Sequence, residues 1–159
     1  MIETKKKYQV FTLRNFYKVP QIQDSLSKHQ KYLINVVGNV LPFKVNNYVV
    51  DELIDWDNIP DDPIFQLTFP QEGMLSSEHF AQMETALAQN LKGKELKAVA
   101  NKIRYQLNPH PAGQQKNVPE INGVKLTGVQ HKYRETVLFF PSNSQTCHAY
   151  CTFCFRWPQ

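Results

Sequence analysis

Residues 136–154 read TVLFFPSNSQTCHAYCTFC. The first five residues of this stretch are apolar or β-forming and do not alternate with polar ones. Such a run is typical of a strand that is buried on both faces, as in a parallel sheet. Pro141 ends the predicted strand, and a cysteine-bearing loop follows it. The stretch therefore predicts a strand over residues 136–140 that leads directly into a loop with a chemical role.

The chain has only three cysteines, Cys147, Cys151 and Cys154, and all lie within eight residues. An odd number at such close spacing argues against a disulfide framework and favours metal ligation in a reducing compartment. Three thiolates can hold three irons of a cubane cluster and leave the fourth iron open to a small chelating ligand. A strand that runs into this loop would place the cluster at the C-terminal end of a parallel sheet, where barrel enzymes build their active sites.

Two other interpretations of the cysteines stay open. Zinc can be held by three cysteines if a histidine completes the tetrahedron. His148 lies inside the loop, but it is adjacent to Cys147, which is awkward geometry for joint ligation; His110 and His131 lie upstream. The third interpretation is that the cysteines bind no metal and are structural.

Composition excludes several other classes of protein. The chain of 159 residues is about the size of one domain, with a net charge of +4 and scattered lysines. No compact basic stripe indicates nucleic-acid binding. No stretch approaches the roughly 18 apolar residues of a membrane span, and no apolar run after Lys5–Lys7 indicates a secretory signal. A cytoplasmic protein without nucleic-acid or membrane partners is therefore expected.

The segment before the strand is predicted to be mostly helical. A helix is expected from Pro20 to Gly38, and a second segment with helical spacing from Pro42 to Leu53. A helix capped by Ser76 or Ser77 and ended by Asn90 or Gly93, followed by a second one with apolar stripe 96–107, predicts a helical hairpin. Residues 108–130 indicate an extended loop with a tight turn at Asn122-Gly123.

The cysteine spacing, with aromatic Phe153 just before the last cysteine, resembles the radical S-adenosylmethionine signature. Flanking segments are similar to the lysine 2,3-aminomutase family within it. These are LRN at residues 13–15, IDW at 54–56, DDPI at 61–64, FP at 69–70, HKYRETVLF at 131–139 and FR at 155–156. The resemblance therefore extends over nearly the whole chain.

This resemblance implies an α/β fold, a partial TIM-type barrel. Residues 1–130 would be a helical lead-in, and residues 131–159 would begin the barrel with strand 136–140 and cysteine loop 147–154. The implied activity is that of an isomerase. S-adenosylmethionine binds the open iron, an electron donor protein supplies an electron, and a 5′-deoxyadenosyl radical forms. The radical removes hydrogen from an amino-acid substrate such as lysine, held on pyridoxal phosphate, and the amino group migrates. The protein supplies position and electrostatics for these cofactors.

The resemblance also implies roles for single residues. Cys147, Cys151 and Cys154 would bind the 4Fe–4S cluster, and Phe153 would pack near the adenine. Arg156 would face the substrate carboxylate as a bidentate guanidinium. Lys132 occupies the place of a family arginine near the cofactor phosphate, which lysine can bind as a point charge. The alternative for Lys132 is an exposed loop cation.

None of the lysines in the sequence matches the Schiff-base lysine of the family, and the chain stops at Gln159. We therefore expect an N-terminal portion with no catalytic residue of its own, inactive without a C-terminal part. The segment between Val137 and Cys147 is longer than in the lysine enzymes, so the substrate amino acid is left open. The rival interpretation is a small zinc-binding or interaction module that uses the same cysteine loop.

Overall fold

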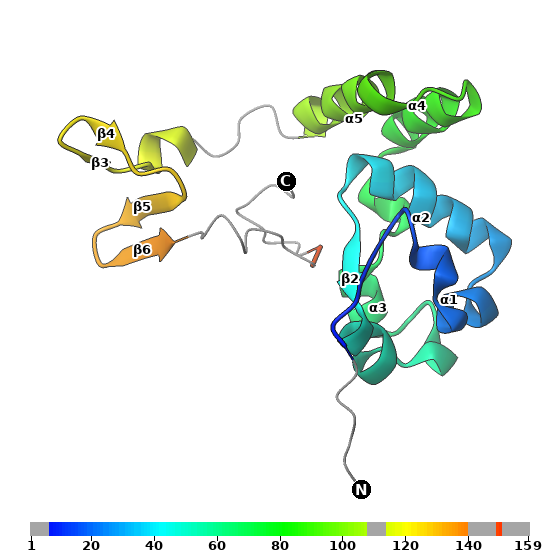
Figure 1. Cartoon of the computed structure of the whole chain (residues 1–159). Coiled ribbons are helices and arrows are strands. Elements are labelled where there is room, and N and C mark those ends of the chain that lie inside the picture. The colour runs from blue at the N-terminus through cyan, green and yellow to red at the C-terminus, as the bar shows by residue number, and fades with distance from the viewer. Residues whose placement is uncertain (1–6, 108–113, 140–148, 151–159) are drawn as a thin grey trace, which may run out of the picture.

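The computed structural model describes residues 7–107, 114–139 and 149–150 (Figure 1). Short strands and helical turns lie before and after one long helix, two more long helices follow, and two hairpins come after these. The first half comprises β1 (Val10–Thr12), η1 (Phe16–Lys18), α1 (Pro20–Ser25), α2 (Lys28–Val40), β2 (Lys44–Asn46), η2 (Val49–Leu53), η3 (Trp56–Asn58) and α3 (Pro63–Thr68). The second half comprises η4 (Glu72–Met74), α4 (Ser77–Ala88), α5 (Gly93–Leu107), η5 (Gln114–Asn117), β3 (Glu120–Ile121), β4 (Val124–Lys125), β5 (Val129–Tyr133) and β6 (Thr136–Phe139).

An aromatic cluster forms the core beneath β1 and β2, which pair antiparallel. The rings of Phe65 and Phe69 stack with their centroids 4.7 Å apart, and Phe43 lies 5.0 Å from Phe69. Trp56 meets both stacked rings edge-on and donates its indole N–H to the carbonyl of Val50 at 2.8 Å. Such large apolar side chains contribute most of the burial energy of a small core. The first cluster is this core with the side chains packed against it: Phe11, Phe16, Val19, Ile22, Leu26, Ile34, Phe43, Val45, Val50, Ile54, Phe65 and Phe69, together with the partly buried Leu13, Val49, Trp56, Ile59 and Ile64.

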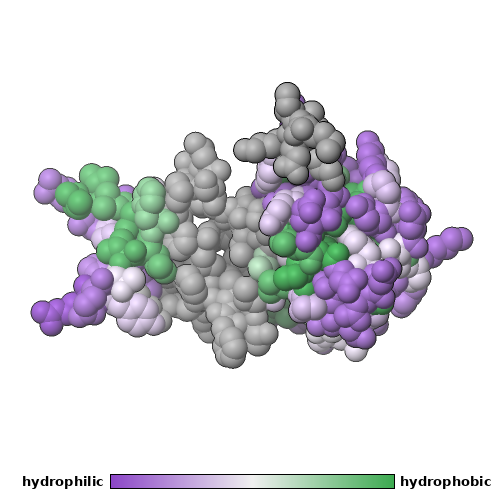
Figure 2. All heavy atoms as spheres, turned by 90° about the horizontal axis from the view of Figure 1, so that it is seen from below, coloured by the Kyte–Doolittle hydropathy of each residue, from purple (hydrophilic) through white to green (hydrophobic). Residues whose placement is uncertain are grey.

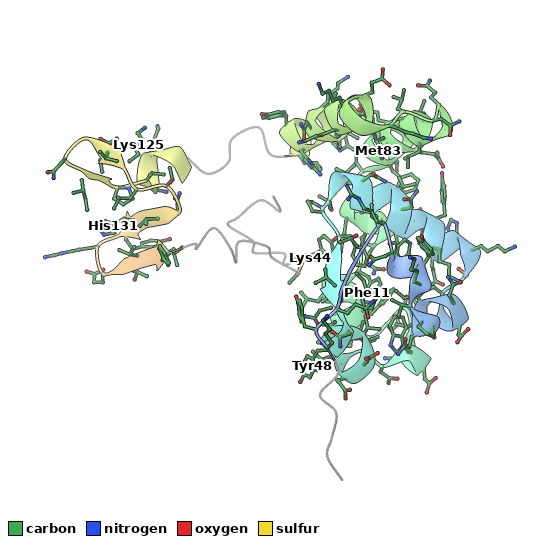
Figure 3. All side chains as sticks on the ribbon, viewed as in Figure 1. Phe11, Lys44, Tyr48, Met83, Lys125 and His131 are labelled. Carbon is green, nitrogen blue, oxygen red and sulfur yellow. The ribbon has the colours of Figure 1, made fainter. Side chains whose placement is uncertain are left out.

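A second cluster lies where α2 packs against α4 and α5. Its fully buried members come from all three helices. They are Val36, Val37 and Val40 of α2, Met83 of α4 and Ile103 of α5. Met83 lies between α4 and α2 in Figure 3. The predicted helical hairpin is therefore confirmed, and α2 supplies the surface on which it packs.

The expected helix from Pro20 to Gly38 is instead two helices. The backbone is extended at Leu26 and Ser27, and Ser27 with Gln30 forms a capping box that starts α2. Gly38 does not stop the helix but lies inside α2. A Cβ atom there would come within 2.8 Å of Cδ2 of Leu13, so the glycine permits the close approach of this leucine. Packing from a distant part of the chain explains the glycine.

Of three further local predictions, two are confirmed and one is wrong in part. Ser76 caps α4, accepting a hydrogen bond from the backbone N–H of His79 at 3.2 Å, as expected. Asn122 and Gly123 have φ values of 52° and 78° and join β3 to β4, so the predicted tight turn is also confirmed. The prediction of helix from Pro42 onward is wrong in its first part, where β2 pairs with β1; the helical backbone begins at Asn47 and includes η2 (Val49–Leu53).

Strand β6 occupies Thr136–Phe139, within the predicted strand, but its environment differs from the prediction. It pairs antiparallel with β5 through a two-residue connection, a link that only antiparallel strands can have. Val137 and Phe139 are 55% and 70% exposed. Apolar side chains are visible on the hairpin surface in Figure 2. Over residues 7–107 and 114–139 the sheets are three antiparallel pairs, so the barrel stays a prediction; the boundary after residue 130 lies within β5.

Asp62 is a buried carboxylate that holds the start of α3. Its side chain is 5% exposed, and it accepts hydrogen bonds from the backbone N–H groups of Phe65 at 2.6 Å and Asp55 at 3.3 Å. Pro63 follows it at the first helical position, where a proline costs no hydrogen bond. One carboxylate thus joins the η3 segment to α3.

We expect Asp62→Ala to lower the free energy of unfolding by about 1–3 kcal/mol, because the helix cap is lost and buried N–H groups are left without an acceptor. Urea unfolding followed by circular dichroism measures this. Asp61→Ala removes the same charge from the exposed neighbouring position and should change stability by less than about 0.5 kcal/mol. Equal losses in the two variants would contradict the assigned role of Asp62.

Candidate functional site

The predicted site divides between described and undescribed parts of the chain. Cys147, Cys151 and Cys154 lie outside the described residues, as do Phe153 and Arg156. Lys132 lies in β5. Two residues of the cysteine loop are described, Ala149 and Tyr150, and they stand in sequence between the first and second cysteines. The geometry of the site is therefore known where the loop meets the helical part.

Tyr150 is anchored at both its backbone and its side chain. Its N–H donates to the carbonyl of Leu67 at 2.8 Å. Its hydroxyl oxygen lies 3.0 Å from the carbonyl oxygen of Pro42 and 3.5 Å from that of Leu41. In Figure 1, residues 149–150 lie beside the chain that enters β2. A single residue of the loop thus reaches two segments that are far apart in sequence.

These acceptors are available because they lie at helix ends. The last four carbonyls of an α-helix have no partner within the helix. Leu67 belongs to the last turn of α3, and Leu41 is the residue that caps the C-terminus of α2, with Pro42 directly after it. The C-terminal end of a helix also carries partial negative charge, which favours donors. Tyr150 therefore satisfies carbonyls that the helices leave open.

Arg104 of α5 completes the same helix end. Its Nε donates to the carbonyl of Val40 at 2.5 Å, and its Nη2 lies 3.4 Å from that of Asn39. Its Nη1 donates to the side chain of Asn101 at 3.0 Å, which fixes the guanidinium plane. Burial lowers the pKa of Arg104, yet a guanidinium stays charged at any ordinary pH. Arg104 and Tyr150 thus lie within hydrogen-bond distance of four successive carbonyls, at residues 39–42.

The ring of Tyr150 packs against the second cluster. Burial raises the pKa of its phenol far above the ordinary value, so the group stays neutral and keeps its proton. A neutral phenol can donate to a carbonyl, whereas a phenolate cannot. The neutral phenol can therefore act as the donor to the carbonyl of Pro42.

The histidines considered for zinc are not brought together by the described chain. His131 lies in β5 and is exposed, and it is visible on the hairpin in Figure 3. His110 and His148 lie outside the described residues. Over the ranges 7–107, 114–139 and 149–150, no three His, Asp or Glu side chains converge on a metal site. Those ranges contain none of the cysteines, so zinc and iron–sulfur ligation both stay open.

Sequence reasoning missed Tyr150 and Arg104. Tyr150 carried a weak signal, since an aromatic residue with a polar tip lies between two proposed ligands. Arg104 carried none, because it occupies the polar face of an amphipathic helix, where arginines are ordinary. Both act on backbone carbonyls, which every residue offers.

No family model, curated protein or solved structure matches this chain. Within the described part of the chain, no helix has the length and apolar character needed to cross a membrane.

We expect Arg104→Met to lower the free energy of unfolding by about 1–3 kcal/mol, because methionine keeps the packing of the stem but leaves the carbonyls of Asn39 and Val40 without their donor. Lys102→Met is the matched control, since it removes one positive charge from an exposed position of the same helix. Denaturant titration of both variants tests the difference. A loss for Lys102→Met as large as that for Arg104→Met would show that charge, and not the helix end, matters.

Proposed function

We propose that Cys147, Cys151 and Cys154 bind a 4Fe–4S cluster and that the chain carries the cluster-binding portion of a radical S-adenosylmethionine enzyme of the aminomutase type. The observation that carries the proposal is the Cys-x3-Cys-x2-Cys spacing of the only three cysteines in the sequence. Three soft thiolates suit an iron–sulfur cluster and leave one iron without a protein ligand. That open iron is where the amino and carboxylate groups of S-adenosylmethionine would bind.

The anchored position of Tyr150 supports a preorganised loop. A loop that must present three thiolates to one cluster gains from a fixed backbone, because ordering a free segment costs roughly 1–2 kcal/mol per residue. Tyr150 lies between the first two cysteines and is bound to α3 and to the end of α2. The helical part would therefore act as the support of the loop.

Four of the six segments that resemble the aminomutase family meet in one place. Ile54, Trp56 and Phe69 belong to the first cluster, together with Leu13 and Ile64. Asp62, from the same set of segments, caps the start of α3. In the last turn of this helix the carbonyl of Leu67 accepts a hydrogen bond from the backbone N–H of Tyr150. These residues have packing and capping roles. They would therefore stabilise the helical lead-in, and the cysteines of the loop would bind the cluster.

The remaining roles follow from the resemblance. When bound, S-adenosylmethionine on the reduced cluster supplies the radical. Phe153 would hold the adenine, Arg156 the carboxylate of the amino-acid substrate, and Lys132 the phosphate of pyridoxal phosphate. An electron donor protein would reduce the cluster, and a cytoplasmic setting would keep the thiols reduced. The parent activity would be that of an isomerase that moves an amino group between neighbouring carbons.

Metal content after anaerobic reconstitution tests the proposal. We expect a brown protein that contains iron and sulfide in equal amounts, and we expect Cys147→Ala, Cys151→Ala and Cys154→Ala each to lose most of the iron. Thr152→Ala, in the same loop, is the control and should keep it. Full iron in all three cysteine variants would sink the assignment. A colourless protein with one zinc per chain, lost in His148→Ala, would favour the zinc module instead.

Cleavage of S-adenosylmethionine tests the open iron separately. The reconstituted protein is incubated with dithionite and S-adenosylmethionine, and 5′-deoxyadenosine is measured by chromatography. We expect its formation by the wild-type protein and its loss in the cysteine variants. An iron-loaded protein that forms none and whose spectrum is unchanged by S-adenosylmethionine would argue for an electron-transfer cluster.

A further inference from the structure

Tyr150 is held at two points that lie at different helix ends. Its backbone N–H is bound to Leu67 in the last turn of α3, and its hydroxyl is bound to Pro42 just beyond α2. The two bonds leave the residue from opposite ends, one from the backbone and one from the tip of the ring. A residue bound at both ends can neither rotate about its χ1 bond nor slide along the surface without breaking one of them. The clamp therefore fixes the position and the direction of the chain at residue 150.

The end of α2 that receives the hydroxyl is itself rigid. Arg104 holds the carbonyls immediately before it, at Asn39 and Val40. Val36, Val37 and Val40 are fully buried in the second cluster, against which the ring of Tyr150 also packs. The acceptor thus lies directly after a helix whose buried face is packed in the second cluster. Hydrogen bonds to this surface therefore restrict the motion of the backbone at residue 150.

We propose that Tyr150 is a positioning residue that clamps the cysteine loop to the C-terminal ends of α2 and α3 and so fixes the environment of the cluster. The inference rests on the proposed cluster-binding function. Cys151 is the next residue in the sequence and Cys147 is three residues before Tyr150. The clamp acts between these two ligands, through the backbone they share.

The clamp should influence how readily the cluster accepts an electron. The potential of an iron–sulfur cluster depends on the hydrogen bonds to its sulfurs and on its exposure to solvent. Release of the backbone at residue 150 would change both for a cluster bound by the neighbouring cysteines. Loss of the clamp is therefore expected to shift the midpoint potential.

The first stage of the test uses the full chain without iron. Tyr150→Phe keeps the ring and the backbone N–H but removes the hydroxyl. We expect amide hydrogen exchange in a peptide that spans residue 150 to become roughly three- to tenfold faster, as the loss of one hydrogen bond implies. Tyr105→Phe makes the same chemical change at a site that is 74% exposed, and it should leave exchange unchanged. Equal exchange in wild type and Tyr150→Phe would overturn the clamp.

The second stage uses the reconstituted protein. All three cysteines are present in Tyr150→Phe, so we expect it to take up as much iron as the wild type. We expect its midpoint potential to shift relative to the wild type and the electron paramagnetic resonance signal of its reduced cluster to be broader. Tyr150→Ala, which also removes the ring, should show the larger shift, and Tyr105→Phe none. A role confined to general stability would lower the melting temperature without moving the potential, and that result would overturn the inference.

The two proposals fail in different ways. Absence of iron from the reconstituted wild type sinks the cluster and the positioning role together, while the exchange experiment still reports whether Tyr150 is bound to the helical part. Normal iron uptake with identical potentials and spectra in wild type and Tyr150→Phe overturns only the positioning role.

Discussion

The end of α2 is the point on which the rest of the structure depends. The carbonyls at residues 39–42 lie beside a packed core. A carbonyl that is removed from water and has no hydrogen-bond donor lowers the stability of the folded state. Arg104 and Tyr150 supply the donors from two distant parts of the chain. The same helix contributes Ile34 to the first cluster and Val36 to the second. Both cores, the helical hairpin and Tyr150 are thus joined through one helix.

The parts of the fold that were predicted correctly are those set by local chemistry. Ser76 caps a helix because its side chain satisfies a nearby N–H, and Asn122-Gly123 makes a turn because both residues tolerate positive φ. The parts that failed were set by distant contacts. Gly38 resembles a helix stop until Leu13 packs on it, and the segment after Pro42 forms a strand because β1 offers it a partner. Neither Leu13 nor β1 is near its target in sequence.

The candidate site shows the same division. The spacing of the cysteines is a local pattern, and it was sufficient to propose a cluster. The support of the loop could not be proposed, because Tyr150 and Arg104 both bind backbone carbonyls, and a carbonyl has no signature in the amino-acid sequence. Only the fold determines which carbonyls are left open, here those of Leu67, Pro42 and the last residues of α2.

The helix ends that bind Tyr150 are themselves held by Asp62 and by aromatic residues of the first cluster. Asp62 caps the start of α3. Phe65 in this helix stacks on Phe69, the residue directly after it. Phe43 packs on Phe69 just after Pro42, so the first cluster lies directly beneath both acceptors of Tyr150. A change in that aromatic stack would move α3 relative to the end of α2, and one of the two bonds of Tyr150 would lengthen. The aromatic core therefore determines the position of both acceptors of Tyr150, although the residues of the core lie far from Tyr150 in sequence.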